Sequence, residues 1–222
     1  MLFIANGHGE TAIAARIGVE IERAAAADPL SLDLFPLVGT GGGAGTLRVV
    51  GPRRAMPSGG LVAMGNVRAF SRDVASGFVV LFMRQISFAR RARAYDAVVA
   101  VGDVYALAFA FATRLPTLFV GTAKSVYVAP YGPFERVLLR RAARVFVRDE
   151  ATAERLRAQG VAAEAPGNVI VDLAGDGGAD APPVRWLGVL PGSRDDAYAD
   201  GVRLARVVRA LGRRRDGASA LL

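Results

Sequence analysis

The stretch that decides the fold is Ala97-Val98-Val99-Ala100-Val101-Gly102-Asp103, near the middle of a chain of 222 residues. Its first five residues are all apolar, and three of them are valine. This pattern predicts a β-strand over 97–101 that is covered on both faces, because a half-exposed strand alternates polar and apolar residues instead. Strands covered on both faces are typical of parallel sheets that lie between layers of helices.

Short apolar runs alternate with helical patterns on both sides of this stretch. We expect further strands at 2–5, 32–38, 47–50, 117–120, 144–147 and 161–164, and helices at 10–27, 66–93, 104–114, 133–141 and 149–159. In the first helix, Ile13, Ile17 and Ile21 recur every four residues on one face. In the last, we expect Asp149 to be the N-cap and Gly160 to end the helix. Such alternation predicts an α/β fold with a mainly parallel sheet.

The composition changes after residue 172. We assign 1–172 to one domain and 173–184, rich in glycine, alanine, aspartate and proline, to a linker. Residues 185–222 start a second domain, with a strand at 186–190, a turn at 191–194 and a helix at 195–212. One strand and one helix cannot bury both faces of a sheet, so we expect this second domain to be incomplete.

The composition excludes several kinds of chemistry. The chain has no cysteine and one histidine, His8, which excludes disulfides, thiol chemistry and metal sites built from cysteines or several histidines. We expect no metal and no other cofactor. The formal net charge is +8, and every basic residue except Lys124 is arginine. A basic surface favours anionic partners, but the arginines are spread out and no nucleic-acid module is present, so we expect no nucleic-acid partner.

The apolar segments are too short to cross a membrane. The first apolar residues stop at Asn6 without a basic start, which does not resemble a signal peptide. The longest apolar run without charge, 74–83, is roughly half a span. We expect a cytoplasmic protein. The run at 78–83 lies beside several arginines and is compatible with peripheral contact on an anionic membrane, although we favour a core helix with a basic, solvated end.

The loop after the first strand reads Asn6-Gly7-His8-Gly9-Glu10. A polar loop that leads into a helix can offer backbone N–H groups to an anionic or sugar ligand, and His8 can exchange protons near neutral pH. The alternative is a tight turn whose histidine only caps the helix.

Two further loops after strands carry charge. Asp103 ends the strand at 97–101, where a carboxylate can serve as a general base or can simply cap the next helix. The loop Gly121-Thr122-Ala123-Lys124-Ser125 holds the single lysine, whose ammonium can bind a phosphate or sugar oxygen or can be an ordinary surface charge.

The turn Leu190-Pro191-Gly192-Ser193-Arg194 follows a strand and opens a helix. Its backbone amides, the Ser193 hydroxyl and the Arg194 guanidinium can hold a diphosphate. An ordinary strand-to-helix turn is the alternative. All these loops follow strands of one expected parallel sheet, so they should gather along one edge.

Taken together and in this order, these loops resemble lipid-A-disaccharide synthase and its uncharacterised relatives. The stretches that carry the resemblance are 6–10, 56–60, 101–104, 119–125, 148–149 with 152–153, 167–168 with 172, and 190–194, of which Leu-Pro-Gly-Ser-Arg at 190–194 is the most specific. That family has the GT-B fold of two facing Rossmann-like domains. The resemblance therefore implies that 1–172 is the acceptor-side domain and that 185–222 begins the donor-side domain.

The resemblance also implies a function. It implies transfer of a sugar from a UDP-sugar to a lipid or sugar acceptor, with Asp103 as general base. From the chemistry of its own side chain, His8 is a second candidate catalytic residue. The residues expected to bind the acceptor are Asn6, Gly7, Gly9, Glu10, Ser58, Gly59, Lys124, Ser125 and Asn168, and those expected to bind the nucleotide sugar are Gly192, Ser193 and Arg194.

The chain also departs from the family. His8 stands where the synthase has a different polar loop, which places the chain nearer the relatives. The later donor-binding segment is absent, so we expect activity to need the missing part of the second domain. A binding protein without activity and a UDP-sugar epimerase remain alternatives.

Overall fold

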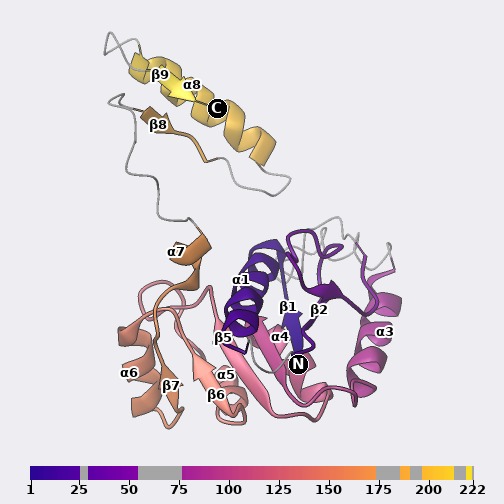
Figure 1. Ribbon diagram of the computed structural model, residues 1–222. Coiled ribbons are helices and arrows are strands. Elements are labelled where there is room, and N and C mark those ends of the chain that lie inside the picture. Colours follow the sequence, from indigo (N-terminus) through magenta and orange to yellow (C-terminus); the bar gives the residue numbers. More distant parts are fainter. Residues whose placement is uncertain (26–29, 55–76, 174–185, 191–196, 213–218, 222) are drawn as a thin grey trace. The chain divides into compact units, whose positions relative to one another are not determined.

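The computed structural model describes residues 1–25, 30–54, 77–173, 186–190, 197–212 and 219–221 (Figure 1). The chain divides into two compact units, Met1–Gly175 and Asp176–Leu222. The residues of the expected linker beyond Leu173 lie outside the described part of the chain.

The first unit is built on one sheet of parallel strands. The strands are β1 (Leu2–Ala5), β2 (Asp33–Pro36), β3 (Arg48–Val49), β4 (Val98–Gly102), β5 (Thr117–Gly121), β6 (Arg144–Phe146) and β7 (Ala163–Glu164). Their order across the sheet is β3-β2-β1-β4-β5-β6-β7, and every neighbouring pair is parallel. The prediction of an α/β fold with a parallel sheet is confirmed, and the order of the first six strands is that of a Rossmann-like fold.

The helices of this unit follow the strands in turn. They are α1 (His8–Ala24), α3 (Phe78–Arg90), α4 (Val104–Ala112), α5 (Pro133–Leu139), α6 (Glu150–Ala158) and α7 (Val169–Leu173). Most bounds lie within a few residues of those expected. The exception is the helix predicted over 66–93: α3 begins only after Gly77, whose φ of 92° is a left-handed conformation, and residues 66–76 are not among those described.

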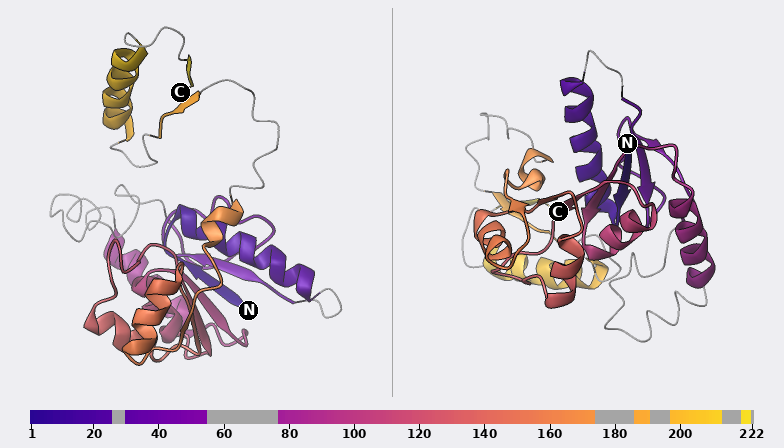
Figure 2. Two further views of the ribbon diagram at one scale, coloured as in Figure 1. Left: turned by 90° about the vertical axis from the view of Figure 1, so that its left-hand side faces the viewer. Right: turned by 90° about the horizontal axis from the view of Figure 1, so that it is seen from below.

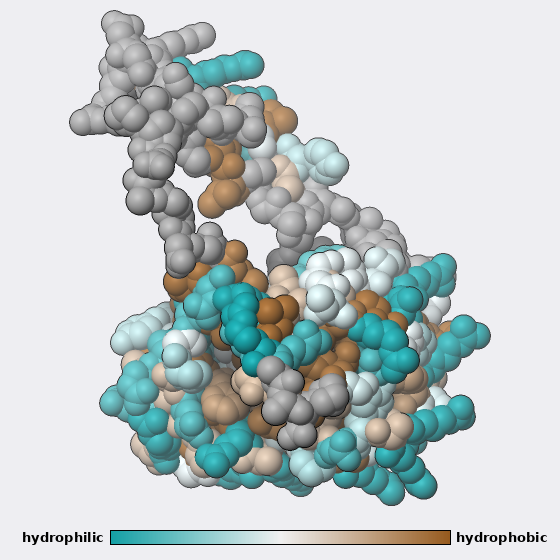
Figure 3. Space-filling view, viewed as in Figure 1, coloured by the Kyte–Doolittle hydropathy of each residue, from teal (hydrophilic) through white to brown (hydrophobic). Residues whose placement is uncertain are grey.

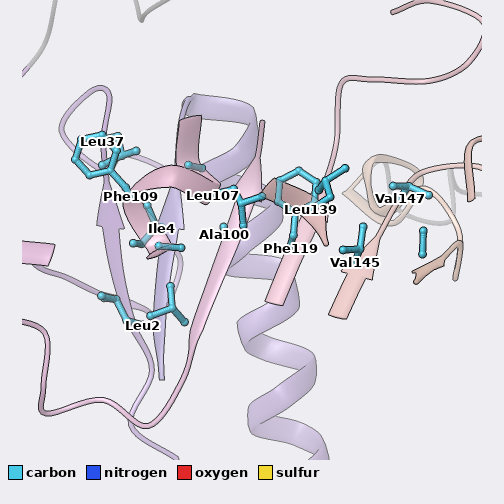
Figure 4. Close-up of a cluster of buried hydrophobic side chains, with 14 of the residues drawn as sticks. Leu2, Ile4, Leu37, Ala100, Leu107, Phe109, Phe119, Leu139, Val145 and Val147 are labelled. Atoms are coloured by element: carbon cyan, nitrogen blue, oxygen red, sulfur yellow. The ribbon is translucent and has the colours of Figure 1, made fainter. Parts of the chain in front are cut away.

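Two apolar layers cover the two faces of the sheet. Leu2 and Ile4 of β1 point into the layer formed with α3, α4, α5 and α6, part of which Figure 4 shows, whereas Phe3 and Ala5 point into the layer formed with α1. All five residues of β4 are buried, as its apolar pattern predicts. The helices accordingly lie on both sides of the strands (Figure 2). Because helices cover both faces of the sheet, its polar residues are found mainly at the ends of the strands.

Pro36 ends β2 inside the sheet, although proline has no N–H group for the ladder. The N–H of Asp33 donates to the carbonyl of Met1, just before β1, and the N–H of Leu37 donates to that of Ala5. Because backbone groups alternate in direction along a strand, the backbone nitrogen of Pro36 faces the side of β3. β3 ends at Val49 and pairs only with the first half of β2, so the position of Pro36 faces no strand that needs a donor.

The second unit is described by itself as a strand, a helix and a strand. β8 (Trp186–Gly188) pairs in parallel with β9 (Ser219–Leu221), and α8 (Ala197–Gly212) lies between them in the chain. The strand and the helix expected here are present, and β9 was not expected. Whether this unit is part of an incomplete Rossmann-like domain stays a prediction.

Several apolar side chains of the helices remain at the surface. Ile170 and Val171 of α7 are 47% and 66% exposed, and Figure 3 shows the hydrophobic surface over this helix. On α3, Val79, Val80 and Met83 are each more than half exposed. None of the helices described is both long and apolar enough to cross a membrane.

Candidate functional site

The strand order creates one natural place for a ligand. From β1 the chain moves outward through β2 to β3, and from β4 it moves outward in the opposite direction through β5 to β7. The loops after β1 and β4 therefore diverge, and ligands of such sheets bind in the crevice that this divergence leaves at the carboxyl ends of the strands. Asn6 follows β1 and Asp103 follows β4, so both lie at this point.

Asn6 and Asp103 are joined across the point where the loops diverge. The Asn6 side-chain Nδ2 donates a hydrogen bond of 2.9 Å to Oδ2 of Asp103. The two residues are 97 positions apart in sequence, and the parallel pairing of β1 with β4 brings them together. The structure thus confirms that the first loop and the loop after β4 meet at one edge.

Asp103 also caps α4. Its Oδ1 accepts the N–H groups of Tyr105 at 2.9 Å and Ala106 at 3.3 Å, in the backbone geometry of an N-cap. The capping role considered from the sequence is therefore present. It also orients the carboxylate, because Oδ1 is tied to the helix while Oδ2 remains toward Asn6.

The Asn6 amide has an unused acceptor. Its Oδ1 is buried and has no hydrogen-bond partner among the described residues. A buried carbonyl oxygen without a partner is unfavourable by about 1–3 kcal/mol. It is therefore suited to accept a hydrogen bond from a ligand hydroxyl that enters this edge.

His8 and Glu10 flank this pair from the first turn of α1. His8 is exposed, and its ring lies on Gly39 of the loop after β2, where a Cβ would come within 2.8 Å of His8 Cε1. The glycine-rich turn was expected to permit a close approach, and this contact supplies one. Glu10 packs over Gly102, where a Cβ would lie 2.9 Å from its Cγ, and accepts a long hydrogen bond from Thr122 at 3.5 Å.

Lys124 lies on the same edge, in the loop after β5, and is held in an ion pair. Its Nζ is 2.7 Å from Glu135 Oε1, and it stands 5.8 Å from the centre of the Tyr131 ring. Glu135 also accepts the N–H of Gly132 at 2.6 Å, so its carboxylate serves α5 and the lysine together. The charge of Lys124 is therefore balanced by Glu135, which the sequence did not indicate.

Tyr131 is a buried residue of the site that the sequence analysis missed. Its hydroxyl lies against Gly121 at the end of β5, has no partner among the described residues, and would clash with any side chain at position 121. Burial, followed by the charges of Glu135, Asp103 and Asp149, raises its pKa, so the hydroxyl keeps its proton and remains a donor.

Two expected binding residues serve the fold itself. Ser125 is only 3% exposed, accepts the N–H of Tyr127 at 3.3 Å and also bonds to Asp149. Asn168 Oδ1 accepts the N–H of Ile170 at 3.3 Å at the start of α7. The side chain of Ser125 is therefore occupied within its own loop, whereas Asn168 is partly exposed.

A small pocket lies beside Asn168 on this edge. It is lined by residues of α1, the ends of β5 and β6 and the loop before α7, and its volume is about 20 Å³, roughly the room that one water molecule needs. The described side chains do not enclose a sugar here. Within this part of the chain, no three acidic or histidine side chains gather as metal ligands.

The remaining expected residues cannot be placed. Ser58 and Gly59, and the nucleotide-sugar residues Gly192, Ser193 and Arg194, lie outside the described residues. The other expected residues share one edge of the sheet, because each lies just after one of three adjacent parallel strands, β1, β4 or β5. They are Asn6, Gly7, His8, Gly9, Glu10, Asp103 and Lys124.

The fold and this edge define the chain's first unit as a Rossmann-like α/β protein with polar loops at the carboxyl ends of β1, β4 and β5. Comparison with known proteins adds no family: neither a protein-family model nor a curated protein sequence matches the chain.

Proposed function

We propose that this protein is a glycosyltransferase of the kind that resembles lipid-A-disaccharide synthase, and that its first unit binds the acceptor. The observation that carries the proposal is the Asn6–Asp103 pair at the divergence of the β1 and β4 loops. A carboxylate that is oriented at a ligand crevice is suited to take a proton from an acceptor hydroxyl. The unused Asn6 Oδ1 beside it supplies a hydrogen-bond acceptor for a sugar.

In this mechanism each residue has a separate task. The acceptor hydroxyl donates to Oδ2 of Asp103, which takes its proton as the oxygen attacks the anomeric carbon of a UDP-sugar, and UDP leaves with the electrons of the broken bond. Asn6 orients the carboxylate and contacts the sugar. His8, exposed on Gly39, binds the acceptor. We assign the diphosphate chiefly to Gly192, Ser193 and Arg194.

The test is UDP release from UDP-diacylglucosamine in the presence of a lipid monosaccharide acceptor, with the disaccharide identified by mass spectrometry. Asp103→Asn keeps an acceptor oxygen for the α4 cap but removes the base, so we expect a loss of at least about 100-fold. Asp96→Asn is the matched control. Asp96 is an exposed carboxylate just before the same strand β4, at the opposite edge of the sheet, and its replacement should leave the rate within about twofold.

A comparable loss in both variants, or full activity of Asp103→Asn, would remove the assigned role of Asp103. Disaccharide formation is required, because an epimerase acting on the UDP-sugar would change the sugar without joining it to the acceptor.

One observation favours a second candidate, a protein that binds the acceptor without transfer. Three donors already bond to the Asp103 carboxylate, and the pocket beside Asn168 on this edge has a volume of only about 20 Å³. Binding of the lipid monosaccharide in equilibrium dialysis that Asn6→Ala weakens would support the second candidate, and UDP release with disaccharide formation by the chain itself would rule it out.

A further inference from the structure

A second candidate site lies at the start of α3, away from the Asn6–Asp103 pair. Here the chain segment after β3 and the first two turns of α3 form a groove of about 390 Å³. The groove is lined by Pro52, Arg53, Arg54, Gly77, Val80, Leu81 and Arg84. Its volume is within the range of small-molecule sites, and three of its lining residues are arginines.

The walls of the groove are held together by a buried side chain. Gln85 of α3 is 1% exposed and its amide donates to the carbonyl of Leu37 at 2.9 Å and to that of Pro52 at 3.4 Å. Gly51 packs closely on the rings of Phe35 and Phe88, where a Cβ would come within 2.6 Å and 3.0 Å. The backbone that carries Arg53 is therefore fixed against the helix that carries Arg84.

Two of the three arginines that line the groove, Arg53 and Arg84, have no counter-charge among the described residues. Arg53 and Arg84 are exposed, and neither forms an ion pair with a carboxylate in the described part of the chain; Arg53 bonds only to the carbonyl of Val49 at 3.3 Å. The first turn of α3 has no acidic residue. Guanidinium groups that line one groove without counter-charges favour an anion, and their planar forks match the oxygens of a phosphate.

The groove also has an apolar side. Val80 lines it one helical turn before Arg84, and the neighbouring Val79 and Met83 are 54% and 61% exposed on the same helix. Over α3, hydrophobic and hydrophilic side chains are intermingled on the surface (Figure 3). A ligand with both a phosphate group and an apolar part would contact both kinds of residue.

We propose that the groove binds a phosphate ester through Arg53 and Arg84. The phosphate group can come from a phospholipid headgroup or from a free phosphate compound, and the chemistry of recognition is the same for both. This site is independent of the proposed transfer reaction, because it shares no residue with the Asn6–Asp103 pair.

Two binding measurements on the full chain distinguish the sources. One is titration calorimetry with inorganic pyrophosphate, and the other is co-sedimentation with vesicles of phosphatidylglycerol in phosphatidylcholine. In whichever of the two assays shows binding by the wild-type chain, the double variant Arg53→Gln with Arg84→Gln should weaken that binding at least about tenfold. The matched control is Arg90→Gln with Arg93→Gln, which removes the same charge from exposed arginines at the other end of α3 and beyond it, and should stay within about twofold of wild type.

Loss of pyrophosphate binding in the groove variant alone supports a free phosphate ligand, and loss of vesicle binding alone supports a headgroup. Equal weakening by both double variants would show a diffuse charge effect and overturn the proposal. Failure of the wild-type chain to bind either probe, or equal binding to vesicles of pure phosphatidylcholine, would overturn it as well. None of these outcomes depends on UDP release, so the proposed function is tested separately.

Discussion

Asp103 shows how one side chain can be both structural and functional. Its Oδ1 holds the start of α4 and its Oδ2 holds Asn6, so the carboxylate is fixed from two sides. The sequence left these roles as alternatives. The structure shows that the cap exists, and that it places the second oxygen where the loops of β1 and β4 diverge.

Replacing Asp103 should separate its two roles. Asp103→Ala removes the N-cap and leaves the Asn6 amide without its acceptor, and we expect unfolding to become easier by about 2–3 kcal/mol. Asp103→Asn should stay within about 0.5 kcal/mol, since asparagine caps equally well and a rotated Asn6 amide can accept from the new amide through its unused Oδ1. Urea unfolding followed by circular dichroism measures both. Equal destabilisation by the two variants would contradict this account.

Gly39 controls the position of the His8 ring. Gly39 has a φ of 76°, and Gly43 has a φ of 84°, but only at Gly39 would a Cβ meet His8. Gly39→Ala and Gly43→Ala should each lower the free energy of unfolding by about 1–2 kcal/mol through backbone strain. Only Gly39→Ala should shift the imidazole resonances of His8, which are unambiguous in NMR spectra because the chain has one histidine. A shift of equal size in Gly43→Ala would show that the contact does not matter.

At the scale of the elements, α6 is tied to the loop after β5 by a network of polar groups. Asp149 Oδ1 accepts the N–H of Thr152 at 2.8 Å and its hydroxyl at 2.6 Å, and the Thr152 oxygen accepts the N–H of Val126 at 3.0 Å. Burial opposes ionisation of Asp149, but the bonds from Thr152 and Ser125 and the charge of Arg148 together outweigh it and lower its pKa. The predicted N-cap is confirmed, as is the stop at Gly160, whose φ is 77°.

Asp149→Ala should lower the free energy of unfolding by about 1–2 kcal/mol, because it removes a cap and leaves the Thr152 hydroxyl without its acceptor. Glu154→Ala, an exposed position on the same helix, should change it by less than about 0.5 kcal/mol. Chemical denaturation of the two variants in parallel gives the comparison. If Glu154→Ala lowered the free energy of unfolding as much as Asp149→Ala, the effect would come from loss of charge on α6 instead of from loss of the cap.

At the scale of the whole molecule, stability in acid should depend on Asp33. This residue begins β2 at the edge opposite the candidate site, where Arg48 donates two bonds of 2.9 and 2.7 Å to it. These bonds lower the pKa of Asp33 below 3.8, against the effect of its burial, and Tyr95 adds a further bond. A lowered pKa contributes stability above pH 3.8 that is lost as the pH falls through the folded-state value. Asp33→Asn should therefore flatten the decline of unfolding free energy below pH 4, whereas Asp96→Asn should leave that decline unchanged.

Stability in alkali should depend on Tyr95 and Tyr105, which are partly buried, and on the buried Tyr131. Burial, together with the bond of 2.6 Å that it donates to Asp33, raises the pKa of Tyr95 to about 12, and burial also raises the pKa of Tyr105 and Tyr131. Their contribution is complete below pH 10 and is lost as the pH rises toward 12. Tyr95→Phe should make this loss shallower without abolishing it, because two tyrosines remain. Tyr127→Phe, at an 80% exposed position, is the control. Unfolding in urea at pH 8 and pH 11 measures the slope, and identical slopes in both variants would contradict the prediction.

The class of fold and most of the elements could be predicted from the amino-acid sequence. The continuous apolar run at 97–101 can only be covered on both faces, and the alternation of strands and helices around it leads to a parallel sheet with its loops along one edge. For the same reason it placed Asn6, Asp103 and Lys124 on a common edge.

The tertiary structure alone decided which of these side chains are already in use. Asn6 and Asp103 are 97 positions apart, Lys124 is neutralised by Glu135, and the buried Tyr131 hydroxyl rests on Gly121. The pattern of polar and apolar residues within a segment indicates which of its side chains are exposed and which are buried, because burial follows the periodicity of a few neighbouring residues. Hydrogen bonds and ion pairs between distant segments depend on strand order and register, and these are set only when the whole sheet has formed.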